Sequence, residues 1–216
     1  MSIMDSTTPA PDREPIPVNR FALFSETLLA GLLVLVLSIP LVTIPAAYAA
    51  GIAHLERHLS GRDDSIRGLW GTFRTALPGS WKLGLTTAAA AVVIVLNLLL
   101  SMVGQLPGSS VVLPATLVLA AAGAVLLLRT TAAWSDFSGA KLDSRPESAN
   151  TPSAAWSSAL NAGKALSLRD WTGSLLLVSA LLGAVVFVWM LVALFVVVPG
   201  TLILAAAAVK LRSNRA

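Results

Sequence analysis

The chain has 216 residues, of which 56% are hydrophobic and only 12% are charged. Soluble domains usually carry about 25% charged residues, so this composition indicates an integral membrane protein. The net charge of +4 comes from basic residues scattered through the loops, which argues against nucleic-acid binding, and the lack of cysteine excludes disulfides and thiolate chemistry.

The N-terminal residues 1–20 are polar and rich in proline, and they predict a disordered tail rather than a signal peptide. The first apolar run follows and predicts a membrane span over 21–43 that also serves as the targeting signal. Pro40 and Pro45 interrupt the end of this run, with Thr43 between them. A proline-broken helix end can line a polar pocket, as in transporters, or simply bend the helix toward the inner membrane surface. The sequence leaves both interpretations open.

Two later stretches, 83–128 and 172–209, contain no charged residue. Each is about twice the roughly 20 residues that cross a bilayer, and each is interrupted once by turn residues, the first at 104–110 and the second at Pro199-Gly200. We therefore predict an all-α fold, a polytopic transmembrane helix bundle of about five spans with cytoplasmic interfacial amphipathic helices. The membrane domain covers 21–212 and is followed by a basic tail at 213–216. The predicted spans are 21–43, 83–102, 111–128, 172–195 and 197–211.

The two longer polar segments, 46–82 and 129–171, each carry five Lys or Arg residues, whereas the two short loops carry none. Basic residues favour the cytoplasmic side, so this count predicts an N-terminus outside and a C-terminus in the cytoplasm.

The same two segments contain amphipathic helices at 67–77 and 154–168, whose aromatic and basic residues we expect to lie near the headgroups and to bind a partner. The candidate docking residues are Trp70, Phe73, Arg74, Trp156 and Leu160.

Few polar residues interrupt the apolar segments. Glu26 is the one acidic residue inside an apolar run, and it predicts either a functional carboxylate or a group among the outer headgroups. Asn97 predicts an interhelical hydrogen bond or, as an alternative, a substrate contact. His54 and His58 lie four residues apart, but no third ligand accompanies them, so we interpret their segment as a solvent-exposed interfacial helix. Without catalytic, metal or cofactor motifs, the sequence predicts no enzyme.

Several segments carry a resemblance to a known family. They are Ser38-Ile39-Pro40-Leu41-Val42-Thr43-Ile44-Pro45, Leu69-Trp70-Gly71-Thr72-Phe73-Arg74, Trp81-Lys82-Leu83-Gly84 and Val198-Pro199-Gly200-Thr201-Leu202. In these, the chain resembles the YesL-like bacterial membrane proteins, a family of unknown function. The resemblance implies a helical protein of the bacterial cytoplasmic membrane, often encoded near sugar-uptake ABC transporters, with no established catalytic residues.

From this resemblance we expect a non-enzymatic accessory or permease-associated component of carbohydrate uptake, with the lipid bilayer and sugar ABC transporter subunits as partners. The chain lacks the Glu-Ala-Ala-x-x-x-Gly coupling loop of ABC permeases in both polar segments, which argues against direct ATPase coupling. The alternative is a small stand-alone transporter that acts as a homo-oligomer, with a path near Pro40 and Glu26.

Overall fold

The computed structural model describes residues 20–61, 65–103, 108–138, 151–190 and 197–213. In these ranges every regular element is a helix, which confirms the all-α class. The helices are α1 (Arg20–Leu37), η1 (Leu41–Thr43), α2 (Ile44–Leu59), α3 (Ile66–Met102), α4 (Ser109–Ser138), α5 (Pro152–Arg169), α6 (Trp171–Met190) and α7 (Val198–Ser213).

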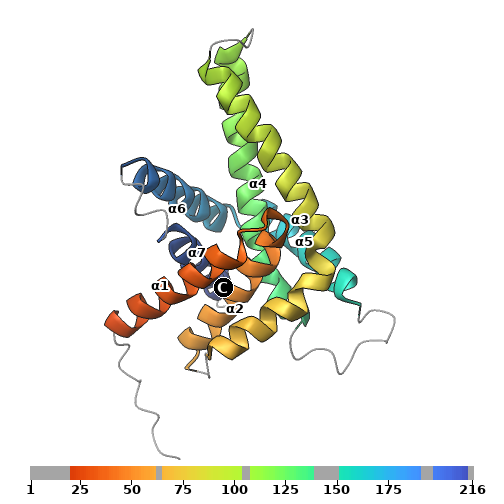
Figure 1. Ribbon diagram of the computed structural model, residues 1–216, viewed down its shortest axis with the longest axis vertical. Coiled ribbons are helices and arrows are strands. Elements are labelled where there is room, and N and C mark those ends of the chain that lie inside the picture. Colours follow the sequence, from red (N-terminus) through yellow and green to blue (C-terminus); the bar gives the residue numbers. More distant parts are fainter. Residues whose placement is uncertain (1–19, 62–64, 104–107, 139–150, 191–196, 214–216) are drawn as a thin grey trace, which may run out of the picture.

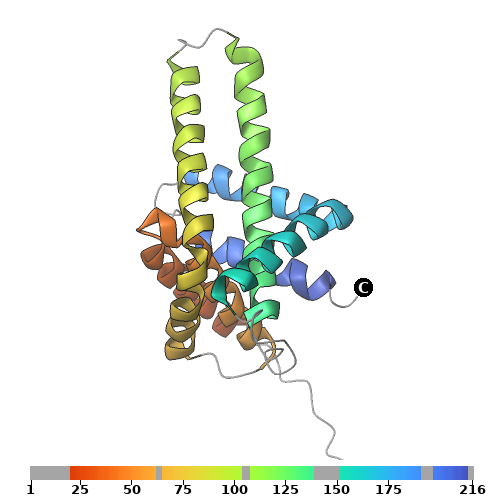
Figure 2. The ribbon, with the colours of Figure 1, turned by 90° about the vertical axis from the view of Figure 1, so that its right-hand side faces the viewer.

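The longest helices, α3 and α4, form an antiparallel hairpin that projects from a base built by the other helices (Figures 1 and 2). Among the described residues, three helices are long and apolar enough to cross a membrane: α3, α4 and α6. The apolar part of α1, Phe24–Leu37, is shorter. In both views α6 runs across the hairpin rather than alongside it. The predicted five spans therefore go beyond what the helix lengths establish.

Helix α3 joins two elements that the sequence separated, the amphipathic helix at 67–77 and the span at 83–102. It begins at a capped end, where the Ser65 hydroxyl accepts a hydrogen bond from the Gly68 N–H at 3.2 Å. The helix then continues through Pro78, which is exposed. An inward face of Leu69, Phe73 and Ala76 is buried against the base, so tertiary packing offsets the cost of the proline.

Helix α2 lies in the middle of the base, and the prediction of a solvent-exposed helix there is wrong. The Thr43 hydroxyl lies 2.5 Å from the Leu37 carbonyl oxygen and 2.6 Å from that of Pro40, and its hydrogen bond to these carbonyls stabilises a reversal between α1 and α2. The side chain of His54 is fully buried. Small residues allow α2 to pack this closely against its neighbours. The buried small residues are Ala46, Ala47, Ala49, Ala50 and Gly51.

Pro199-Gly200 was expected to separate two spans, but the structure places both residues in the first turn of α7. A Cβ atom on Gly200 would lie 2.6 Å from the Thr27 carbonyl oxygen of α1. One on Gly31 would lie 2.6 Å from the Gly200 nitrogen. Only glycine permits two helix backbones to approach this closely, so this pair sets the contact between α1 and α7.

Candidate functional site

Helix α2 directs polar side chains toward several neighbouring helices within the base. His54 Nε2 lies 2.5 Å from Glu26 Oε1 of α1, and Arg57 Nη2 donates to the Thr72 hydroxyl of α3 at 3.2 Å. Glu56 contacts α4 and α7. Buried polar groups must find partners or carry a large desolvation cost. The charged segment that looked solvent-facing in sequence is therefore the polar centre of the fold.

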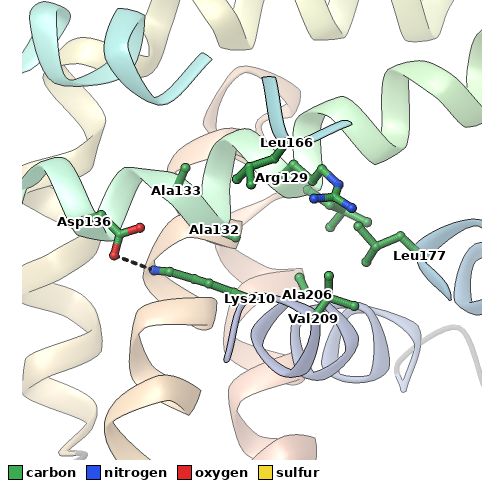
Figure 3. A pocket seen from close by; sticks show the side chains of 10 residues that line it. Arg129, Ala132, Ala133, Asp136, Leu166, Leu177, Ala206, Val209 and Lys210 are labelled. Atoms are coloured by element: carbon green, nitrogen blue, oxygen red, sulfur yellow. Dashed lines mark ion pairs between the residues drawn. The ribbon is translucent and has the colours of Figure 1, made fainter. Parts of the chain in front are cut away.

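Lys210 of α7 lies between two carboxylates. Its Nζ donates to Glu56 Oε2 at 3.2 Å, while Glu56 Oε1 lies 2.9 Å away without hydrogen-bond geometry. The same ammonium lies 3.1 Å from Asp136 Oδ1 (Figure 3). It also donates to the Ser135 hydroxyl at 2.5 Å. The side chains of Lys210 and Glu56 are only 11% and 14% exposed. The network therefore joins α2, α4 and α7 by a largely desolvated cation.

A cavity of about 70 Å³ lies beside this network, with Arg129 and Lys210 both on its lining (Figure 3). Apolar residues of α4, α6 and α7, such as Ala132, Leu177 and Ala206, form much of its remaining wall. A cavity of this size with charged side chains on its wall can hold ordered water. It is too small for a sugar.

Arg129 and Asp170 join α4 to the start of α6. The Arg129 guanidinium is buried, and its Nη2 lies 3.2 Å from Asp170 Oδ2 and 3.0 Å from the Asp170 carbonyl oxygen. Asp170 also caps α6, because its Oδ1 accepts a hydrogen bond from the Gly173 N–H at 3.0 Å. The Gly173 hydrogen bond and the Arg129 guanidinium hold the pKa of the Asp170 carboxyl below its usual value, despite the opposing effect of burial.

Replacing Asp170 by asparagine should make the free energy of unfolding less dependent on pH in the acid range. Because the folded pKa lies below the unfolded value of 3.8, the ionised carboxylate stabilises the protein above that value, and this stabilisation is lost as the pH falls through the folded pKa. At neutral pH we expect a loss of about 1–3 kcal/mol, because asparagine can still accept the Gly173 hydrogen bond but leaves the buried Arg129 guanidinium without its counter-charge. Thermal unfolding in detergent between pH 3 and pH 7 measures both effects. A constant difference between Asp170→Asn and wild type across this range would contradict the assignment.

The predicted candidate element of Pro40, Thr43 and Pro45 forms the turn between α1 and α2. Pro40 precedes η1, and Pro45 lies in the first turn of α2, where a missing N–H costs little. The turn packs on α3, where a Cβ on Gly84 would overlap the Val42 carbonyl oxygen. The Thr43 hydroxyl is engaged by backbone carbonyls. These contacts favour the interpretation as a structural bend.

The structure joins one predicted site residue, Glu26, to His54, a histidine that the sequence analysis interpreted as solvent-facing. Asn97 lies near the C-terminal end of α3, where it is half-buried. Of the polar centre, Glu26 was predicted from the sequence as a candidate site residue, whereas Glu56, Arg129 and Lys210 were not. The sequence did contain a signal for two of these residues, since Arg129 and Lys210 are the first charged residues after the two charge-free stretches.

The candidate docking residues divide into two groups. Trp156 is buried, stacks on Trp134 with ring centroids 5.6 Å apart, and donates from Nε1 to the Ala76 carbonyl oxygen at 2.9 Å. Phe73 is also buried, and Leu160 is half-buried. Trp156 and Phe73 pack inside the base and therefore do not offer a surface to a partner, whereas Leu160 stays partly accessible.

Trp70 and Arg74, the other two candidates, lie on the surface of α3. Trp70 is 48% exposed, and the Arg74 guanidinium lies 5.8 Å from the centre of its ring. Both side chains are therefore accessible to a partner.

In comparisons with known proteins, no family model, no curated protein and no solved structure matches the chain.

Proposed function

We propose that the protein is a non-enzymatic integral membrane protein whose α3–α4 hairpin crosses the bilayer. The observation that supports this proposal is the hairpin itself, which projects from the base and contains no charged residue from 83 to 128 (Figure 2). Its large apolar side chains face outward, with Val93 57% and Val118 70% exposed. Soluble monomers rarely expose a continuous apolar surface of this extent, whereas lipid covers it without cost.

The proposed orientation places the hairpin tip outside a bacterial cytoplasmic membrane and the base on the cytoplasmic side. The Lys and Arg residues of 46–82 and 129–171 support it, because these segments flank the charge-free part of the hairpin. Five spans with the N-terminus outside and the C-terminus in the cytoplasm belong to the same proposal. In that arrangement α6 has to lie alongside the hairpin in the bilayer, whereas here it crosses the hairpin.

The proposed role is that of an accessory component that binds a partner through α3. Four exposed apolar residues of α3 lie on one side of the helix. The other three follow the first of them, Ile66, by 4, 11 and 15 residues, and each of these spacings is close to a whole number of helical turns. Arg74 lies beside this stripe and contacts Trp70. Exposed Trp and Arg residues often dominate the energy of protein interfaces. We name this surface the α3 stripe; it consists of Ile66, Trp70, Leu77 and Trp81.

A sugar ABC transporter subunit is the proposed partner, on the basis of the family resemblance alone. Tagged protein purified from its native membrane in gentle detergent should recover this subunit, as read by mass spectrometry. Trp70→Ala should reduce the recovery at least tenfold. Trp189→Ala is the matched control, because Trp189 is 87% exposed on α6 and lies outside the stripe. Equal recovery with both variants would contradict docking through α3.

A second candidate function is a stand-alone transporter that acts as an oligomer, and the contact between Glu26 and His54 favours it. A carboxylate in an apolar helix that touches a buried imidazole is a typical element of ion or proton pathways in membranes. In that case the purified protein should move a labelled sugar into liposomes without a partner, and Glu26→Gln should abolish the uptake. Absence of uptake by the wild-type protein for every sugar tested would exclude this function and favour the accessory role.

A further inference from the structure

A large apolar groove lies where α4, α5 and α6 meet. Its volume is about 690 Å³, within the range of small-molecule sites, and it is distinct from the charged cavity beside Lys210. Its apolar wall comes from one face of α4, from Leu168 near the end of α5 and from the first turns of α6. The apolar lining residues are Val118, Ala121, Ala122, Val125, Leu126, Leu168, Leu175 and Val178.

The polar lining of the groove comes from the end of α5 and the start of α6. Lys164 and Ser167 belong to α5, and Trp171, 74% exposed, begins α6. Arg169 is exposed in the last turn of α5, while the nearby Arg129 and Asp170 neutralise each other. Within the part of the chain that the structure describes, neither Lys164 nor Arg169 forms an ion pair, so this end carries excess positive charge where it borders the apolar wall.

From this arrangement we infer that the groove binds one anionic phospholipid, with its phosphate near Lys164 and an acyl chain along α4 and α6. The inference rests on the proposed membrane location of the hairpin, with α6 crossing it as in the structure (Figure 2). An exposed tryptophan between the charges and the apolar wall matches the headgroup level, where such rings are favoured. A basic residue close to an anionic lipid surface contributes about 1 kcal/mol, or about fivefold in affinity, which a zwitterionic headgroup does not provide.

Native mass spectrometry of the purified full-length chain tests this inference by titration with phosphatidylglycerol and with phosphatidylcholine of the same acyl chains. The wild type should bind phosphatidylglycerol at least fivefold more tightly. Lys164→Gln should reduce this preference about fivefold, whereas Lys82→Gln, at an exposed lysine on α3, should leave it unchanged. Ala122→Trp should block both lipids by filling the groove, whereas Ala89→Trp, at an exposed position of α3, should not.

Equal affinity of the wild type for the two lipids would overturn the anionic assignment. Lipid binding that Ala122→Trp leaves unchanged would overturn the assignment of the binding site to the groove. Recovery of a partner protein that Ala122→Trp releases and that phosphatidylglycerol does not displace would assign the groove to a protein helix instead. Each of these results is distinguishable from failure of the membrane proposal, in which the purified chain would stay soluble without detergent and bind neither lipid.

Discussion

Replacing Lys210 by methionine should lower the free energy of unfolding by about 3–5 kcal/mol, which is typical when one member of a buried ion pair is removed. The methionine keeps the apolar part of the lysine side chain but leaves the Glu56 carboxylate, only 14% exposed, without its cation. The Ser135 hydroxyl also loses a hydrogen-bond partner. The effect should extend to α2, α4 and α7, because all three helices meet at this ammonium.

Thermal unfolding in detergent, followed by circular dichroism, measures this loss. Arg212→Met is the matched control, because Arg212 is exposed on the same helix two residues later and should change stability by less than about 0.5 kcal/mol. Adding Glu56→Leu to Lys210→Met should restore much of the stability, since a well-packed apolar pair can replace a buried ion pair. A Lys210→Met protein as stable as the Arg212→Met control would show that the network is not formed.

Trp156→Ala should destabilise the base by about 3–5 kcal/mol, the usual cost of removing a buried tryptophan. The indole fills space between α3 and α4 and stacks on Trp134. Its loss also leaves the buried Ala76 carbonyl oxygen without the indole N–H. This expectation differs sharply from that of a docking residue, whose removal would weaken binding but not folding.

Three variants separate these contributions in the same unfolding measurement. Trp156→Phe should retain part of the packing and lose the hydrogen bond, with an intermediate effect. Trp70→Ala should change stability little, because its ring lies on the surface of α3. A loss for Trp70→Ala as large as that for Trp156→Ala would reverse the assigned roles of the two residues.

The sequence predicted the fold class and the projecting helices well, because both follow from local properties. A charge-free stretch of sufficient length forms a helix suited to lipid whatever its neighbours are, and the turn residues near Gly108 separate α3 from α4. Helix ends were less accurate. Arg129 was expected to lie just beyond the span 111–128, at the start of a polar segment, yet it is buried within α4, which continues to Ser138, because Asp170 and the neighbouring helices bury and pair its guanidinium.

The pairing of charged residues in the polar centre could not be predicted from the sequence, because it depends on tertiary contacts. His54 and Glu26 are 28 residues apart and meet only after the chain reverses at Thr43. Glu56 and Lys210 are 154 residues apart. A charged segment next to an apolar run ordinarily indicates a surface helix. Here the preceding alanines and Gly51 let α2 enter the interior instead.

The central claim is that the hairpin crosses the membrane with its tip outside and the base in the cytoplasm. Single-cysteine labelling tests it directly, because the chain contains no cysteine of its own. Ser110, near the hairpin tip, and Ser157, on α5, are both exposed. With a membrane-impermeant maleimide on intact cells, Ser110→Cys should label without permeabilisation and Ser157→Cys only after it. Labelling of Ser157→Cys from outside, or equal labelling of both positions before and after permeabilisation, would contradict the proposed orientation.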